Sequence, residues 1–398
     1  MMLSARARAL TGSQTSGMRN RARQLKADGI SVVNFAAGEL DQDTSTLVKD
    51  ATRRAIEEGR TQYTDTLGIK ELRGRLAQKV SDKTGAMYTP DEVGFTAGAK
   101  QALFHSVFTA FGPGDEVIIP APYWVTFPEQ VRLAGAKPVF LSTTEHAFQI
   151  DVNELAQKIT PRTRGILLST PHNPTGVVYS ADVLNAIAQL AEQHDLICIF
   201  DECYDELVYA PAVHHNIVKL RPEMKARTVL VGSLSKTYCM AGWRAGFVAG
   251  PQAFIKAIAN LQSHTSSNAC NLVQYAALAA LSLENDPFVS KIRALLSNQR
   301  ETALRHLETI RLISCVVPTG AFYLFPNISQ LLTKSYEGQP LGNVELLAEM
   351  LLQHAHIAVV PGSAFGADEH IRISYAIPEN DIAVGLASFK RFVEKLTS

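Results

Sequence analysis

The stretch LICIFDE, residues 196–202, decides the fold class. Its five consecutive apolar residues leave no polar face, which predicts a strand that is buried on both sides. Strands of that kind occur in parallel sheets that helices cover on both faces. Asp201 and Glu202 follow the apolar run directly, so two carboxylates stand at the carboxyl end of the predicted strand.

Further short β-rich runs lie on either side of this strand and alternate with segments of helical period, such as 99–111 and 180–194. This alternation predicts an α/β fold with a mostly parallel, seven-stranded sheet between helices. The other six runs are VGFTA (93–97), EVIIP (116–120), KPVFL (137–141), GILLST (165–170), TVLVG (228–232) and AGFVAG (245–250).

The pattern changes after about residue 286 to short strands and amphipathic helices, which predicts a smaller α+β domain. We expect residues 1–45 to form an N-terminal arm and part of this small domain. Residues 46–285 then form the large ligand-binding domain, and residues 286–398 form the small C-terminal domain.

Composition argues against several classes of protein. The chain has 38 basic and 38 acidic residues, so no overall positive field attracts nucleic acid. No apolar run approaches the roughly 20 residues that span a bilayer. The five cysteines, an odd number without CxxC spacing, predict buried free thiols in a cytoplasmic protein and neither disulfides nor a metal site.

The N-terminal 26 residues contain six basic residues before the first acidic residue, Asp28. An organellar transit peptide has this composition. We favour the alternative, an N-terminal arm followed by a helix from about residue 17 to 28.

A second informative stretch is SLSKTYCMAGWRAGF, residues 233–247. Hydroxyls from Ser233 and Ser235 and the guanidinium of Arg244 suit a phosphate group. The segment Gly98–Lys100 opens a predicted helix after a strand, and its amides can donate to the same anion. A lysine beside a phosphate site, here Lys236, suggests a Schiff base with an aldehyde. We expect glycines 242 and 246, on either side of the arginine, to let the chain pass close to such a ligand.

Asp201 could keep a ring nitrogen protonated, and pyridoxal 5′-phosphate combines such a nitrogen with an aldehyde and a phosphate. Each residue also has an ordinary explanation taken alone. Asp201 could cap a turn, NPTG (173–176) could be a plain turn, and Trp124 could belong to the core. Their shared position after successive strands favours one ligand site, because ligands of parallel sheets bind beyond the carboxyl ends of the strands.

These residues stand in motifs that resemble the fold-type I, pyridoxal 5′-phosphate-dependent class I and II aminotransferases over almost the whole chain. The resemblance implies an enzyme that moves an amino group between an L-amino acid and a 2-oxo acid by a ping-pong mechanism, and a homodimer with shared active sites. The motifs, in order, are AGE (37–39), QYTDTLGIKELR (62–73), TAGAKQAL (96–103), PGDEVIIPAPYW (113–124), PHNPTG (171–176), DECYDELVY (201–209), SLSKTYCMAGWRAG (233–246), GAFYLFP (320–326) and VVPGSAFG with HIRISYA (359–376).

The resemblance also implies a role for each matching residue. Lys236 binds the cofactor aldehyde and moves the proton at the substrate Cα, Asp201 pairs with the ring nitrogen, and Tyr204 contacts the ring oxygen with Asn173. Trp124 covers the ring face, and Arg372 binds the substrate α-carboxylate with help from Asn173 and Gly38. The implied phosphate ligands are Gly98, Ala99, Lys100, Ser233, Ser235, Arg244 and, from the neighbouring subunit, Tyr63.

The sequence indicates the substrate less clearly than it indicates the cofactor. The segments AGAKQALF and GSQTS resemble the bacterial aspartate and aspartate/prephenate aminotransferase subgroup, which implies that Lys100, Ser13 and Thr15 meet a distal carboxylate of the substrate. The alternative is that Lys100 supports the phosphate end or faces solvent. Leu40, Gln42 and Ser45 stand where the family has Pro, Phe and Pro, which leaves the substrate open; Cys239, where the family has a small residue, is a milder change.

Two other classes of function share these features. A β-lyase, an oxidase or a cyclase acting at Cβ or beyond uses the same lysine and aspartate. A cofactor-sensing transcription regulator carries a DNA-binding domain ahead of the matching region, and we expect none here because only about 30 residues precede that region.

Overall fold

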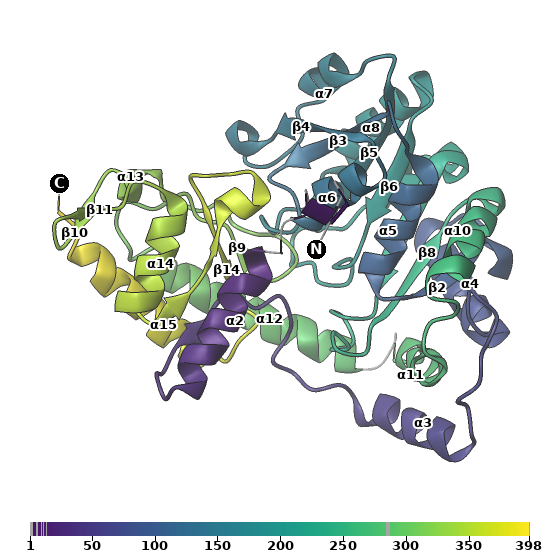
Figure 1. The fold of residues 1–398 in the computed structure, drawn as a ribbon, viewed down its shortest axis with the longest axis horizontal. Coiled ribbons are helices and arrows are strands. Elements are labelled where there is room, and N and C mark those ends of the chain that lie inside the picture. Colours follow the sequence, from purple (N-terminus) through teal and green to yellow (C-terminus); the bar gives the residue numbers. More distant parts are fainter. Residues whose placement is uncertain are drawn as a thin grey trace.

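The computed structural model describes the chain except residues 1–2, 5–6, 9, 11, 13, 284–286 and 398. The predicted seven-stranded sheet is present, and each strand lies within two residues of the expected bounds (Figure 1). Its strands are β2 (Val93–Ala97), β3 (Glu116–Ala121), β4 (Lys137–Ser142), β5 (Thr163–Ser169), β6 (Ile197–Asp201), β7 (Thr228–Ser233) and β8 (Ala245–Ala249).

The sheet is mostly parallel, as predicted. The strand order is β2-β8-β7-β6-β5-β3-β4, and the neighbours from β7 to β4 all pair in parallel. Strand β8 is the exception, because it runs antiparallel to both β7 and β2. Strand β6 therefore lies at the centre of the sheet, where the apolar run 196–200 is covered on both faces.

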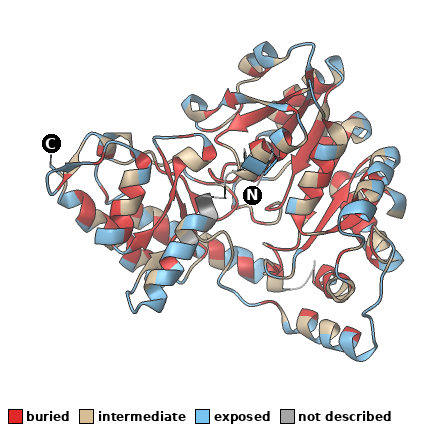
Figure 2. Cartoon of the chain, in the orientation of Figure 1, coloured by how far each residue is buried: buried red, intermediate tan, exposed pale blue. Residues whose placement is uncertain are grey.

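The strands of the sheet are largely buried (Figure 2), and residues of β3, β5, β6, β7 and β8 are divided between two hydrophobic cores, one on each face of the sheet. In β6, Ile199 belongs to one core, whereas Cys198 and Phe200 belong to the other. Helices α5 (Ala99–Ala110), α6 (Thr126–Leu133) and α10 (Gln252–Thr265) cover the Ile199 face. Helices α4 (Lys70–Thr84), α8 (Ala181–Gln193) and α11 (Asn271–Leu281) cover the opposite face.

The C-terminal part forms smaller sheets with their own helices. Strands β13 (Val360–Pro361), β14 (Ile371–Ser374) and β9 (Tyr323–Leu324) pair antiparallel in that order, and β12 (Ile357–Ala358) pairs with β1 (Val33–Asn34) of the N-terminal segment. The remaining described elements are α3 (Thr46–Glu57), α7 (Val152–Lys158), α9 (Ile217–Leu220), α12 (Pro287–Leu307), α13 (Ser329–Leu332), β10 (Ser335–Tyr336), β11 (Gln339–Pro340), α14 (Val344–His354) and α15 (Glu379–Glu394), with short 3-10 turns between them.

The N-terminal segment packs on this C-terminal part. Helix α2 (Gln14–Ala27) begins three residues earlier than expected, and Arg21 forms an ion pair with Glu349 of α14. This contact and the β1–β12 pairing support our proposal that residues 1–45 complete the small domain. The proposed boundary at 285/286 lies outside the described residues.

The cysteines only partly match expectation. All five are free thiols, but Cys270 is exposed, because it stands at the solvent-facing start of α11, and Cys239 and Cys315 are half-buried. Across the part of the chain that the structure describes, no helix is both long and apolar enough to cross a membrane.

Candidate active site

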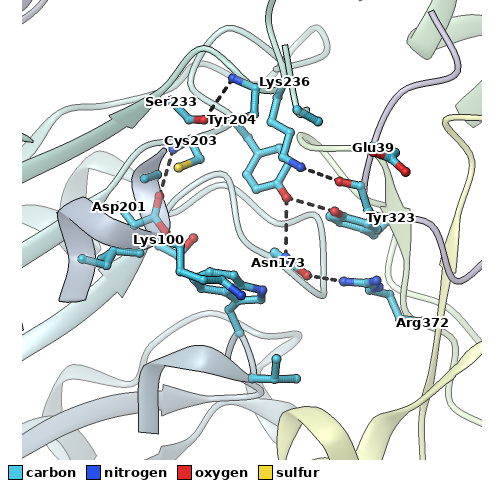
Figure 3. A pocket seen from close by; sticks show the side chains of 18 of the residues that line it. Glu39, Lys100, Asn173, Asp201, Cys203, Tyr204, Ser233, Lys236, Tyr323 and Arg372 are labelled. Carbon is cyan, nitrogen blue, oxygen red and sulfur yellow. Dashed lines mark hydrogen bonds between the residues drawn. The ribbon is translucent and has the colours of Figure 1, made fainter. Parts of the chain in front are cut away.

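A cavity of about 460 Å³ opens beyond the carboxyl ends of β5, β6 and β7 (Figure 3). It collects side chains from segments far apart in the sequence, which agrees with the position where parallel sheets bind ligands. The sequence-predicted residues that line it are Gly38, Ala99, Lys100, Trp124, Asn173, Asp201, Tyr204, Ser233, Ser235, Lys236, Arg244 and Arg372.

Asp201 ends β6 with its side chain in the cavity and is 5% exposed. Its carboxylate accepts a hydrogen bond of 3.0 Å from the Cys203 amide, and burial raises its pKa to about 6. Among the described residues, no cation forms a salt bridge with this carboxylate. A buried acid of this kind is suited to a cationic group of a bound ligand, which would favour its charged form.

Lys236 follows β7 and lies across the cavity from Asp201 (Figure 3). Its Nζ donates a hydrogen bond to the carbonyl of Gly38 and lies 5.7 Å from the ring centroid of Tyr204. Burial lowers the lysine pKa to about 8. The neutral amine, which is the nucleophilic form, is therefore far more populated at neutral pH than it is for an exposed lysine.

The predicted phosphate ligands surround the start of α5. Gly98 precedes this helix at φ +82°, and a Cβ built there would lie 2.4 Å from Nη2 of Arg244. A Cβ at Gly246 would lie 2.3 Å from the amide nitrogen of Ala99. The two glycines thus let the arginine and the helix amides lie against each other, and together with Ser233 and Ser235 they form an anion cradle.

Gly242 differs from Gly246 in its protein surroundings. Among the described residues, no protein atom lies within 4 Å of a Cβ built at Gly242, so this glycine makes no close contact with another segment of the chain. Gly242 is exposed, and its neighbours Ala241 and Arg244 line the cavity, so its expected closeness to a bound ligand stays a prediction.

Arg372 of β14 lies on the opposite side of the cavity from the anion cradle and is 3% exposed. Its Nη1 donates to Asn173 Oδ1 at 3.0 Å, and its Nη2 donates to the carbonyl of Ala36 at 3.3 Å. Among the described residues, no partner meets its buried Nε, and no acid forms a salt bridge with it. A buried guanidinium held by neutral oxygens is prepared to bind a planar carboxylate.

Lys100 lines the cavity from the first turn of α5, with its Nζ 5.0 Å from the ring centroid of Trp124. Of its expected partners at a distal carboxylate, Ser13 lies outside the described residues. Thr15 lies in α2, and only its backbone is described.

Tyr63 does not contribute to the cavity of its own chain. It is 88% exposed, on the loop between α3 and α4. A role at a phosphate therefore requires another copy of the chain.

The structure adds lining residues that the sequence reasoning did not select. Tyr323 had a signal, because it stands in the motif GAFYLFP, and Glu39 directly follows Gly38. Leu103, Cys203 and Ala241 also stand in quoted motifs, but nothing in their side-chain chemistry marked them as site residues. The same holds for the rest, which are ordinary apolar or small polar side chains. The added residues are Ala36, Glu39, Leu103, Val125, Ser169, Cys203, Ala241 and Tyr323.

Pyridoxal 5′-phosphate matches this donor set. The anion cradle suits its phosphate, the amine of Lys236 suits its aldehyde, and the buried carboxylate of Asp201 suits its ring nitrogen. The described residues include no group of three or more His, Cys, Asp or Glu side chains placed to hold a metal ion.

Comparisons with known proteins agree with this chemistry. The model of the family described as "Aminotransferase class I and II" matches residues 30–389. The chain is 39% identical to an aspartate aminotransferase of Geobacillus stearothermophilus, over 99% of both chains. It is also 39% identical to a probable aspartate/prephenate aminotransferase of Aquifex aeolicus, over 99% of both chains.

Solved structures of similar proteins have the same fold. An aspartate aminotransferase from Thermus thermophilus with maleate superposes with a TM-score of 0.93 at 37% identity, covering 98% of this chain and all of the other. The aspartate aminotransferase from Rhizobium meliloti gives a TM-score of 0.95 at 34% identity, with both chains fully covered.

Proposed function

The chain belongs to the class I and II aminotransferase family and is a pyridoxal 5′-phosphate-dependent aminotransferase of fold type I, and we propose that its preferred amino-acid substrates carry a second carboxylate. The observation that carries this proposal is the pair of cations on different sides of one cavity, Arg372 and Lys100 (Figure 3). The two relatives described above, which are named as aspartate and aspartate/prephenate aminotransferases, support it.

When bound, the cofactor supplies an aldehyde that takes up the amino group and a ring that withdraws electrons from the substrate Cα. We propose that Ser233, Ser235, Arg244 and the amides of residues 98–100 hold its phosphate, and that Asp201 keeps its ring nitrogen protonated. We further propose that Tyr204 donates a hydrogen bond to its ring oxygen and that Trp124 covers its ring face.

In this proposal Lys236 is the base and acid of the reaction. Its lowered pKa, about 8, allows the amine to take a proton from the substrate Cα and return it on the next step. Arg372 binds the α-carboxylate through two parallel hydrogen bonds, which fixes the direction of the Cα–H bond relative to the amine. Asn173, which also lines the cavity, accepts a hydrogen bond of 3.0 Å from Arg372 and holds the guanidinium in place.

The segment that departs from the family pattern lies beside this site. Thr44 Oγ1 donates to the Cys239 carbonyl at 2.7 Å and accepts from Trp243 Nε1 at 2.9 Å. Leu40 packs against the large core, and Ser45 precedes α3. These contacts attach residues 40–45 to the turn that carries Lys236. The structure gives no account of why Leu40 and Ser45 replace prolines.

We predict that Lys100→Ala lowers kcat/KM for L-aspartate about 10- to 100-fold, the cost of one charge-assisted hydrogen bond. For a monocarboxylic amino acid such as L-alanine the change should stay below about threefold. The measurement is the half-reaction of the purified enzyme with each amino acid, followed by the absorbance of the cofactor in rapid mixing. Lys70→Ala, which changes an exposed lysine at the start of α4, is the control.

An equal loss for both classes of substrate would contradict the proposal and would place Lys100 at the phosphate end instead. The same screen separates a transaminase from a β-lyase, an oxidase or a cyclase. Only transamination leaves the amino group on the cofactor without releasing ammonia.

We also propose that the enzyme is a homodimer in which Tyr63 completes the phosphate site of the partner subunit. The loop that carries Tyr63 is hydrogen-bonded by two buried glutamines, although the Tyr63 side chain itself is exposed. Buried Gln274 donates to Thr64 Oγ1 at 2.9 Å and accepts from the Ile69 amide at 2.7 Å, and buried Gln262 donates to the Thr66 carbonyl at 2.6 Å. An exposed aromatic side chain on a loop that is held by several hydrogen bonds is suited to contact another protein surface, here that of the partner subunit.

Mixed dimers test this arrangement. A dimer of one Lys236→Ala chain and one Tyr63→Phe chain should contain one fully native site, because Lys236 comes from one chain and Tyr63 from the other. That site should bind the cofactor as tightly as wild type, whereas the Tyr63→Phe homodimer should bind it about 3- to 10-fold more weakly. Differently tagged chains are co-expressed, purified and titrated with cofactor.

The matched control combines a wild-type chain with a chain that carries both substitutions. The one site of this dimer that keeps Lys236 then lacks the partner's tyrosine hydroxyl and should show the weaker affinity. Equal affinities in the two mixed dimers would refute the shared site, and a failure of the two tags to purify together would refute the assembly.

A further inference from the structure

Tyr323 closes a ring of contacts that joins the two halves of the site (Figure 3). Its hydroxyl lies 2.9 Å from the hydroxyl of Tyr204, and the guanidinium of Arg372 lies 4.4 Å from its ring centroid. Asn173 completes the ring, since it contacts Tyr204 OH at 3.5 Å and accepts from Arg372 at 3.0 Å. All four side chains are more than nine-tenths buried.

The donors and acceptors of these four side chains limit the directions that their hydrogen bonds can take. A tyrosine hydroxyl has one proton to donate and can accept two hydrogen bonds. If Tyr204 gives its proton to the cofactor ring oxygen, its two acceptor positions are open to Tyr323 OH and to Asn173 Nδ2. Burial raises the pKa of both phenols, so each keeps its proton at neutral pH. Tyr323 is then the donor of the 2.9 Å bond.

Tyr323 also supports the other half of the site. Its strand, β9, pairs antiparallel with β14, the strand that carries Arg372. One face of the Tyr323 ring lies against the guanidinium of Arg372, and the Phe365 ring centroid lies 5.1 Å from the central carbon of the same guanidinium. A desolvated cation over an aromatic face is stabilised and loses rotational freedom.

We propose that Tyr323 is a positioning residue with two separable functions. Its hydroxyl orients the proton of Tyr204 toward the cofactor oxygen, and its ring orients Arg372 toward the substrate α-carboxylate. This inference rests on the roles proposed above for Tyr204 and Arg372, and it assigns the connection between them to one side chain.

Tyr323→Phe removes the hydroxyl and keeps the ring. We expect kcat to fall about 3- to 10-fold, the cost of one hydrogen bond, with KM for the amino acid changed less than twofold. Weaker donation from Tyr204 also raises, by about half a unit, the pH midpoint of the visible absorbance change of the bound cofactor. Tyr323→Leu removes the ring as well, and it should raise KM and the dissociation constant of a dicarboxylate inhibitor such as succinate about fivefold or more.

The two functions are tested by a double-mutant cycle and by a matched control. In a Tyr204→Phe background, Tyr323→Phe should shift the absorbance midpoint no further, because the hydroxyl acts through Tyr204. Tyr336→Phe, which alters another buried tyrosine outside the cavity, should leave every parameter unchanged. Thermal unfolding of each holoenzyme shows whether a variant is folded.

Additive shifts in the cycle, or a Tyr323→Phe enzyme within experimental error of the wild type, would overturn the hydroxyl function. Equal KM values for the Phe and Leu variants would overturn the ring function. The absorbance titration needs no substrate, so it judges Tyr323 even if the proposed dicarboxylic preference fails in the half-reaction screen.

Discussion

Replacing Lys236 by alanine is expected to abolish turnover, with a loss of about 10⁴-fold or more in kcat, because in the proposed mechanism this one amine both binds the cofactor aldehyde and moves the substrate proton. The structure shows why no other group takes over. Lys236 Nζ is the amine of the cavity whose burial lowers its pKa to about 8, whereas Lys100 lies at the cavity's Trp124 side. Borohydride reduction followed by intact-mass measurement should show the cofactor attached to the wild-type chain and absent from the variant chain.

The variant should remain folded and should still bind the cofactor without a covalent bond, since the anion cradle and Asp201 are unchanged. Lys225→Ala, which removes a lysine paired with Glu92 outside the cavity, is the matched control and should keep full activity. If Lys236→Ala retained more than a small fraction of wild-type activity, the lysine would have to be reassigned.

Asp201→Asn is expected to have the second largest effect. Loss of one member of a buried, hydrogen-bonded charge pair costs about 2–5 kcal/mol, which predicts a decrease of roughly 30- to several-thousand-fold in kcat/KM. Asparagine keeps the shape and can still accept from the Cys203 amide, so the loss reports the charge. Steady-state kinetics and cofactor titration measure it.

The pH dependence of cofactor binding follows from the same carboxylate. Burial raises the pKa of Asp201 to about 6 in the cofactor-free protein, and pairing with a cationic ring nitrogen lowers that pKa. Affinity is therefore complete above pH 6 and decreases as pH falls through 6, because the carboxyl group must lose a proton in order to pair. The cofactor phosphate also titrates near pH 6, which affects the affinity of the wild type and of Asp201→Asn alike. Because only the wild type has the Asp201 carboxyl group, it should lose more cofactor affinity between about pH 8 and 5 than Asp201→Asn does.

A wild type and a variant with the same pH profile would contradict the assignment of Asp201. Stability gives an independent check. The cofactor-free variant no longer buries an unpaired carboxylate, so it should unfold at a temperature equal to or above that of the wild type. A lower unfolding temperature would indicate a structural role for the charge.

Much of the fold could be predicted because its strands are short, apolar and separated by helices with a clear period. All seven predicted strands of the large sheet are present, and the alternation of strands and helices predicted that most of them run parallel, but it did not predict their order in the sheet. The antiparallel insertion of β8 between β2 and β7 could not be predicted, because a run that is apolar on both sides carries no signal of strand direction.

The site was predictable where a residue has unusual chemistry for its position. Lysine, arginine and serines together in residues 233–247 pointed to a phosphate and an aldehyde before any geometry was known. Tyr323 had only its place in the motif GAFYLFP as a signal, because its proposed importance comes from a 2.9 Å contact with a residue 119 positions away. For Gly246 the tertiary structure supplies a reason that the sequence does not show, since a Cβ there would lie 2.3 Å from the amide nitrogen of Ala99, whereas the role expected of Gly242 stays a prediction.

The fold class, the cofactor and the chemically unusual residues follow from the sequence, because they depend on residue type and local order. The motif resemblance selects Asp201 for the ring nitrogen, but the apolar pattern gives no physical reason why Asp201 and not its neighbour Glu202 faces the cavity; the folded structure supplies that reason. The strand before them is apolar on both sides, so its pattern does not distinguish the two faces. In the folded protein Ile199 and Asp201 lie toward α5 and the cavity, whereas Glu202 points to the α4 side and pairs with Lys83 at 2.9 Å. That choice is made by helices packing on each face of the sheet, an interaction between distant segments that no local pattern encodes.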